Sequence, residues 1–326
     1  MKDRIIKILK IVVPIGIGLY LTWYFIDGMS EKDVEDVKNA FREADYAWVA
    51  LSLVIMFLSH FSRAYRWLFV LEPLGYKPKL VNSYHSVMSG YIINYTVPRS
   101  GEVARAGLMA TYEDIPFEKG FATIVAERVI DLVMFAIVFF ISGLLQVNND
   151  EIKSITQRDG EPSYLIWYIL GGMFLFGLIG LIIYLKNQKV KNFINEKLRG
   201  FLEGLKAIWT MKKKWAFIGH TIFIWACYVG AIWVTAQAFP QTKDMPIGLV
   251  FAAFVVGAAA IGATPGGLGL YPLWITGALA AYGIEFKAFG AFAWVTQTGL
   301  LVVLGLLSLF LIQRKPKLRT ESKNDQ

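Results

Sequence analysis

Three charged residues lie close together in an otherwise apolar stretch. Glu127, Arg128 and Asp131 fall inside the apolar run from residue 121 to 145. A charged side chain at the centre of a spanning helix costs roughly 2.5 to 3.5 kcal/mol, so these groups must face a protein interior or a wet cavity. Their spacing of three and four residues lets the side chains meet on adjoining helix faces. Such a cluster is either an internal ion pair that fixes helix packing or part of a transport path.

The composition places the chain among integral membrane proteins. Of its 326 residues, 56% are hydrophobic and 15% aromatic, which is more apolar material than one soluble core needs. A spanning helix requires about 20 apolar residues, and six runs approach that length. These runs are residues 7–26, 47–71, 121–146, 163–185, 214–239 and 286–312. We therefore expect an all-α polytopic membrane protein, with one domain over residues 1–313 and a polar tail at 314–326.

Lysines and arginines in short loops predict which ends face the cytoplasm. Residues 186–214 hold nine basic residues against two glutamates, and the tail after residue 313 is also basic. Both are expected in the cytoplasm, together with the N-terminus. Residues 27–45 hold seven acids against three basic residues, and residues 150–161 hold four against two, so both are expected outside. The predicted location is the cell membrane.

Two segments outside the spans are expected to be amphipathic. Apolar residues recur at helical spacing among lysines over 187–213, which predicts a basic helix on the inner leaflet. Residues 27–46 are expected to form an acidic amphipathic loop on the outer side. The net charge of +8 is explained by the insertion signal and by attraction to anionic lipid, and it does not imply nucleic acid.

Two more apolar stretches are broken by proline and glycine. From the sidedness of their neighbours, residues 82–118 and 247–283 must each cross the membrane an even number of times. The apolar part of the first, about residues 82–97, is too short for two spans, so it predicts a re-entrant hairpin from the cytoplasmic face. The second is either a hairpin from the opposite face or two short spans, and its turn at 264–269 can also be read as a plain tight turn. Opposed broken helices predict a site near the midplane, as in transporters with inverted repeats.

The first break lies in residues 94–105, which read NYTVPRSGEVAR. Ser100 is placed to cap the helix after the proline, and Glu102 in the first turn suits the helix dipole. Arg99 and Arg105 are suited to phosphate because the guanidinium fork matches phosphate oxygens. A helix N-terminus adds free N–H donors.

Three motifs together resemble those of the flippase-like family that includes the transmembrane half of bacterial lysylphosphatidylglycerol synthases. They are Asn94-x3-Pro98-Arg99-x-Gly101-Glu102-x2-Arg105, Glu127-Arg128-x2-Asp131 and Thr264-Pro265-Gly266-Gly267-Leu268-Gly269. The resemblance covers about residues 8–312 and implies a stand-alone member without the synthase domain. Members are thought to move phospholipids or polyprenyl-linked intermediates between leaflets. Many relatives carry an acid shortly after the last motif, where this chain has Tyr271-Pro272, so a role of that acid does not transfer.

The expected function is transbilayer movement of an anionic phospholipid or a polyprenyl-phosphate-linked lipid. In this hypothesis Arg99, Arg105 and Arg128 hold the headgroup phosphate. Glu127 and Asp131 neutralise these arginines or compete with the phosphate for them. The full candidate site is Asn94, Arg99, Glu102, Arg105, Glu127, Arg128, Asp131, Thr264, Pro265, Gly266, Gly267 and Gly269, with Arg63 and Arg66 as secondary members. Arg63 and Arg66 can also be read as residues that snorkel to the interface.

Two other classes of function stay open. The first is an intramembrane lipid-modifying enzyme that uses Glu127 or Asp131 as acid or base. The second is a non-transporting partner of a separately encoded synthase or glycosyltransferase. Enzyme motifs are missing, since no nucleophile elbow, phosphate-binding loop or zinc helix is found. With three dispersed histidines and one cysteine, we expect no metal, cofactor or disulfide. The expected partners are membrane lipids, a separate synthase and, in an oligomer, further copies of the chain.

Overall fold

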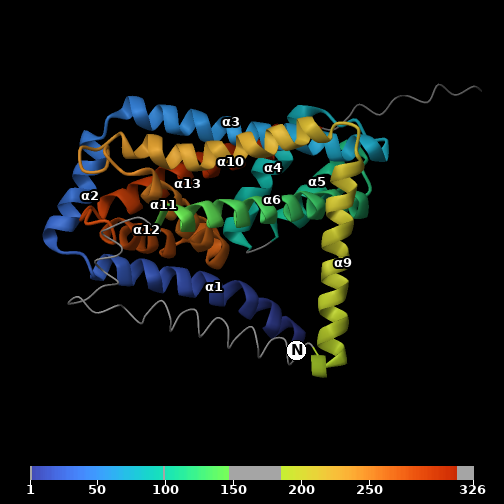
Figure 1. Ribbon diagram of the computed structural model, residues 1–326, viewed down its shortest axis with the longest axis horizontal. Helices are drawn as coiled ribbons and strands as arrows, with labels where there is room; N and C mark the ends of the chain where they lie inside the picture. Colours follow the sequence, from blue (N-terminus) through green and yellow to red (C-terminus); the bar gives the residue numbers. More distant parts are fainter. Residues whose placement is uncertain (1, 98–99, 147–184, 314–326) are drawn as a thin grey trace, which may run out of the picture.

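The computed structural model describes residues 2–97, 100–146 and 185–313. Every regular element in these ranges is helical, which confirms the predicted all-α class. The elements are α1 (Lys2–Asp27), α2 (Glu31–Glu43), α3 (Tyr46–Leu71), η1 (Glu72–Leu74), α4 (Leu80–Thr96), α5 (Gly101–Glu113), α6 (Phe117–Gln146), α9 (Gln188–Thr210), α10 (Lys214–Ala236), α11 (Ile247–Ala263), η2 (Pro265–Gly267), α12 (Leu270–Ala280) and α13 (Ala288–Leu311). The long helices α3, α6 and α10 run along the long axis of the molecule (Figure 1).

Four described helices are long and apolar enough to cross a membrane. They are α3 continued by η1, α6, α10 and α13, which correspond to four of the six predicted spans. The first predicted span falls in α1, whose residues 12–27 meet the same test only together with α2, across a bend of 107°. The predicted span at 163–185 lies outside the described residues, apart from its last residue. The described helices are those of a polytopic membrane protein.

Two pairs of short helices occupy the broken stretches. α4 and α11 have 17 residues each, while α5 has 13 and α12 has 11. At about 1.5 Å per residue the shorter arms reach only about 20 and 17 Å, against a hydrocarbon core of about 30 Å. These lengths favour a hairpin over two full spans in both stretches. The α4–α5 pair lies toward the end that carries α9, and the α11–α12 pair lies toward the end that carries α2 (Figure 1).

The tips of the two hairpins touch each other. Gly266 has a φ of 59°, and a Cβ atom on it would overlap the ring of Tyr95 on α4. Both conditions require glycine, because other residues rarely adopt this φ and carry a side chain. The Gly266 carbonyl accepts a hydrogen bond of 2.8 Å from Trp294 Nε1, and the Tyr95 hydroxyl donates to Thr298 Oγ1 at 3.5 Å. Helix α13 therefore contacts both tips.

The first hairpin is closed by a side chain that differs from the predicted one. Ser100 makes no capping hydrogen bond to α5, and its hydroxyl donates to the Val97 carbonyl instead. The acceptor at the start of α5 is Asn94, whose Oδ1 receives the N–H of Gly101 at 2.7 Å. A Cβ atom on Gly101 would lie 2.7 Å from Asn94 Cγ, so the arms approach closely only because residue 101 is glycine.

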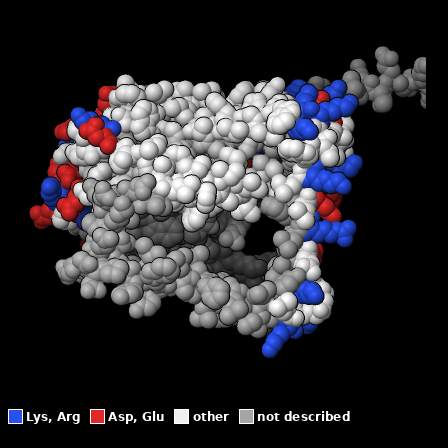
Figure 2. Space-filling view, in the orientation of Figure 1, with Lys and Arg blue, Asp and Glu red and all other residues white. Residues whose placement is uncertain are grey.

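The two ends of the bundle carry opposite charge. The expected loop at 27–46 contains the acidic helix α2, because Ser30 and Asp33 form a capping box that starts it. Helix α9 runs across the other end of the bundle (Figure 1). Acidic side chains gather over α2 and basic ones over α9 and its neighbours (Figure 2). We call these the acidic end and the basic end.

The apolar core of the described residues consists of one large cluster and three small ones. The large cluster joins α10, α11, α12 and α13, where Leu249, Ile275 and Phe292 are fully buried. A smaller cluster around Trp67 and Met109 holds α3, α5 and α6 together. The smaller cluster lies directly beside the charged residues of α6, since Trp67 also stacks on one of their arginine partners.

Candidate functional site

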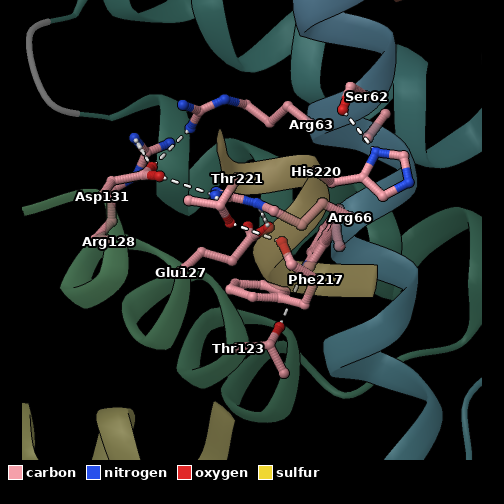
Figure 3. Close-up of polar contacts among 12 residues, drawn as sticks. Ser62, Arg63, Arg66, Thr123, Glu127, Arg128, Asp131, Phe217, His220 and Thr221 are labelled. Atoms are coloured by element: carbon pink, nitrogen blue, oxygen red, sulfur yellow. Dashed lines mark hydrogen bonds and ion pairs between the residues drawn. The ribbon is translucent and has the colours of Figure 1, made fainter. Parts of the chain in front are cut away.

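The carboxylates of α6 are paired with arginines from neighbouring helices (Figure 3). Glu127 is fully buried, with Oε1 3.4 Å from Arg66 Nε and Oε2 2.9 Å from Arg105 Nη1. Asp131 Oδ2 accepts a hydrogen bond of 3.1 Å from Arg63, and Oδ1 accepts one of 3.0 Å from Arg66. Arg63 and Arg66 come from α3 and Arg105 from α5, so these ion pairs connect three helices.

Arg128 lies at the edge of this group. Its Nε is 3.5 Å from Glu102 Oε1 on α5, and its Nη1 is 3.3 Å from Asp131 Oδ2. The Arg128 side chain is 40% exposed and the Glu102 side chain 32%, whereas the other charged side chains of the group are nearly inaccessible. The expected meeting of all three α6 charges holds for Arg128 and Asp131 only. Consecutive residues on a helix point about 100° apart, so Glu127 faces away from Arg128. It is linked to Asp131 through Arg66, which pairs with both carboxylates.

The group carries more positive than negative charge. We name it the arginine cluster and define it as Arg63, Arg66, Arg105 and Arg128 with Glu102, Glu127 and Asp131. Four arginines face three carboxylates, which leaves one positive charge in excess among these seven residues. Several guanidinium nitrogens also lack a hydrogen-bond partner among the described residues, namely Arg63 Nε, Arg66 Nη2 and Arg105 Nε and Nη2. A buried charge without a partner is costly, so this cluster is suited to an anion.

The cluster sits at membrane depth in the half of the bundle near the basic end. With a rise of about 1.5 Å per residue, Arg66 and Arg63 lie about 8 and 12 Å from the end of α3 at Leu71. Glu127 lies about 15 Å from the start of α6 at Phe117. The hydrocarbon core is about 30 Å thick, so these charges are well below the headgroup region if α3 and α6 cross the bilayer.

Neighbouring side chains fix the orientation of two arginines. The guanidinium of Arg105 lies 3.7 Å from the ring centroid of Trp67, a cation–π contact. The indole N–H of Trp67 in turn donates to Thr123 Oγ1 at 2.9 Å. Arg66 donates to Thr221 Oγ1 at 2.9 Å. Sequence reasoning missed these three contacts; the available signals were threonines in the apolar runs of α6 and α10.

Tyr228, His60 and Tyr91 lie next to the cluster on the side away from the basic end. Arg63 Nη2 donates to the Tyr228 hydroxyl at 3.1 Å. His60, one turn before Arg63, is buried and makes an edge contact with Tyr91 at 5.0 Å between ring centroids. Tyr91 belongs to α4, so this arm of the first hairpin contacts α3 one turn before Arg63.

The structure brings together only part of the predicted site. It joins Glu102, Arg105, Glu127, Arg128 and Asp131, and the two arginines of α3 are central to the cluster although the sequence marked them as secondary. Asn94 instead closes the first hairpin. Arg99 lies outside the described residues.

The third sequence motif, residues 264–269, serves the junction between the hairpins. Thr264 donates to the Ala260 carbonyl at 3.3 Å, and Pro265 and Gly267 are buried. A Cβ atom on Gly269 would meet the backbone of α1 at Leu21, 2.8 Å away. Beyond its own arms α11 and α12, this turn contacts α1, α4 and α13. Among the described residues, none of these contacts involves the arginine cluster.

Comparison with known proteins shows to which family this arrangement belongs. Residues 11–316 match the family described as the lysylphosphatidylglycerol synthase TM region. The chain belongs to this family. The matched range contains every residue of the arginine cluster and both hairpins, which confirms the resemblance found in the three motifs.

Two curated relatives are similar to this chain. The first is "UPF0104 membrane protein MJ1595" of Methanocaldococcus jannaschii, 32% identical over 146 residues, which cover 44% of this chain and 40% of that protein. The second is "Glycosyltransferase AglD" of Haloferax volcanii, 26% identical over 305 residues, which cover 82% of this chain and 49% of that protein. The chain spans less than half the length of these relatives. No solved structure matches with significance. Family and relatives together indicate a membrane protein related to lipid modification or translocation.

Proposed function

We propose that this protein translocates an anionic phospholipid or a lipid-linked intermediate between the leaflets of the cell membrane, without changing it chemically. The observation that carries the proposal is the excess of buried guanidinium over carboxylate in the arginine cluster. A phosphate oxygen is the natural partner for guanidinium nitrogens that have no other acceptor, because charge-assisted hydrogen bonds are the strong ones.

The headgroup enters where the cluster is accessible. Arg128 and Glu102 are the two partly exposed members, so the phosphate meets Arg128 first and displaces Glu102 from it. Deeper in the cluster, the phosphate competes with Glu127 for Arg66 and Arg105. The carboxylates therefore hold the arginines in place when no lipid is bound. The acyl or prenyl chains stay in the surrounding lipid.

The contact between the hairpin tips controls passage toward the acidic end. Tyr95 packs on Gly266, which closes the space between the two hairpins. Separation of these tips opens a route for the headgroup along α13, whose Thr298 and Trp294 side chains supply hydrogen-bond donors and acceptors. The orientation expected from the loop charges places the basic end and both termini in the cytoplasm.

Exchange in liposomes tests the proposal. Purified protein should accelerate exchange of a headgroup-labelled anionic phospholipid, read as the fraction accessible to an external quencher. Arg105→Lys should reduce the rate although the charge is retained, because an ammonium group cannot form the bidentate fork. Arg199→Lys on the exposed face of α9 is the matched control and should exchange as wild type. Rates equal to empty liposomes, with phospholipids and with polyprenyl phosphates under a proton gradient, would refute translocation.

A second candidate is a membrane subunit that presents a lipid-linked substrate to a separately encoded glycosyltransferase. The similarity to about half of a protein named a glycosyltransferase favours it. In that case the purified protein binds polyprenyl phosphate through the arginine cluster but exchanges no lipid. Binding without exchange therefore selects this candidate, and chemical turnover of the lipid by the pure protein would select an intramembrane enzyme.

A further inference from the structure

Helix α9 presents a basic and aromatic surface at the basic end. Residues 188–210 hold five lysines and arginines against two glutamates, and three lysines follow at 212–214. Arg199, Lys206 and Trp209 are exposed. Basic residues line the outer edge of this helix in the space-filling view (Figure 2). This composition is typical of a helix that binds an anionic lipid surface.

The corner between α9 and α10 adds an aromatic anchor. Trp209 and Trp215 stand edge to face with ring centroids 6.2 Å apart, and both are exposed. Lys214 Nζ lies 4.9 Å from the Trp209 ring. Tryptophan and lysine together favour the headgroup region, where one side of the ring is apolar and the other wet. Helix α9 runs across the ends of α6 and α10 (Figure 1), an orientation along the membrane surface if those helices cross the bilayer.

The inner side of α9 packs on the turn of α6 that carries the arginine cluster. A Cβ atom on Gly204 would lie 3.2 Å from Val129 Cγ2, so the two helices are in close contact at this point. Ile208 is buried against Ala126 and Phe217. Ala126 and Val129 flank Glu127 and Arg128 in the chain, and the Phe217 ring lies 5.0 Å from the Arg66 guanidinium. A displacement of α9 is therefore transmitted to the paired charges.

We propose that α9 binds the anionic lipid surface of the leaflet at the basic end and that this contact sets the geometry of the arginine cluster. The anionic lipid content of that leaflet then regulates the protein. Charge complementarity identifies the occupant, since each lysine or arginine near an anionic surface contributes about fivefold in affinity. The regulatory part rests on the proposed function, whereas the binding part is measurable without transport.

The first experiment measures binding of α9 to the surface. A spin label is attached at Leu202→Cys in a Cys227→Ala background, and its depth is read in phosphatidylcholine vesicles with and without about one third phosphatidylserine. The label should move toward the headgroups when phosphatidylserine is present, and neutralisation of the helix by the triple change K189Q, K191Q and K206Q should abolish the shift. The control is K32Q with K38Q on α2, which removes charge from the acidic end and should leave the shift intact. A depth independent of phosphatidylserine overturns the proposal.

The second experiment measures the coupling. Exchange of a trace labelled lipid should rise several-fold with phosphatidylserine in wild type and stay flat in the neutralised α9 variant. If phosphatidylserine competed with the labelled lipid for the transport site, the exchange rate would fall instead. The direction of the change in rate therefore distinguishes regulation from competition. Gly204→Val should keep the depth shift but lose the rise in rate, because the added side chain moves α9 off Val129. An exchange rate that does not depend on phosphatidylserine would overturn the proposed regulation. No exchange in any vesicle would refute the proposed function, and the depth shift alone would then test whether α9 binds the lipid surface.

Discussion

The pair of Glu127 and Arg105 provides the sharpest test of the arginine cluster. Both side chains are buried and their charged atoms lie 2.9 Å apart. At an effective dielectric constant of about 20, the gross attraction at this distance is about 6 kcal/mol, and the cost of desolvation offsets much of it. Glu127→Gln or Arg105→Gln should each lower the free energy of unfolding by about 3–5 kcal/mol. The first leaves the buried Arg105 without its carboxylate, and the second leaves Glu127 only the longer 3.4 Å pair with Arg66.

A double-mutant cycle isolates the interaction itself. The double variant should lose about 2–3 kcal/mol less than the sum of the two single losses. The matched control is the pair of Arg199 and Glu203 on α9, which has the same separation of 2.9 Å but side chains that are 83% and 65% exposed. Its coupling energy should be only about 0.3–0.5 kcal/mol, because water screens the charges and the side chains lose entropy on pairing.

The measurement is equilibrium unfolding in mixed micelles of mild detergent and dodecyl sulfate, followed by tryptophan fluorescence. The folded yield from gel filtration ranks any variant that fails to refold. A coupling energy for Glu127 and Arg105 no larger than that of the exposed α9 pair would refute a dry, charge-paired cluster. If the double variant regains stability but not lipid exchange, Arg105 is needed for the substrate as well as for the fold.

Three further predictions follow from other contacts. A hydrogen bond from Lys287 lowers the pKa of Asp33 from 3.8 to about 2, so this pair adds stability above about pH 4 that is lost as the pH falls toward 2. In Lys287→Met, the midpoint of thermal unfolding should fall less between about pH 4 and 2 than in wild type. The same pH dependence in both proteins would contradict the role of the pair. Gly266→Ala should destabilise the protein by about 1–3 kcal/mol, partly recovered by Tyr95→Ala, and a neutral effect would rule out close tip contact. A single cysteine at the exposed Ile247, in a cysteine-free background, should react from outside intact cells with an impermeant thiol reagent, and protection there would reverse the orientation.

The fold was predictable because membrane spans leave a simple signal. Continuous apolar length identified α3, α6, α10 and α13, and the bounds agree within a few residues. Apolar length gives no information about segments outside the bilayer. The sequence interpretation therefore predicts an amphipathic loop over residues 27–46, where the structure forms α2. The sequence does contain the capping box of Ser30 and Asp33, but its energetic contribution is small and local, so it does not by itself predict a helix.

The site was predictable only in part, because partners on other helices are not encoded by spacing. The charges of α6 required counter-charges, yet nothing in the sequence showed which arginines would meet them. For Arg63 and Arg66, a position near the end of a span favoured snorkelling, whereas the structure turns both inward to Asp131. Ser100 had the right residue type for a cap, but the close approach of Gly101 to α4 gave that position to Asn94.

The contact of the hairpin tips also has a consequence for biogenesis. Tyr95 hydrogen-bonds to Thr298, which follows it by 203 residues, and Arg66 hydrogen-bonds to Thr221, 155 residues later. When the first hairpin leaves the ribosome, neither the helix that receives its tip nor the threonine that binds Arg66 has been made. The contacts that hold the tip of this hairpin therefore form only after the helices between α5 and α13 have been synthesised, so the hairpin is one of the last elements to reach its final packing.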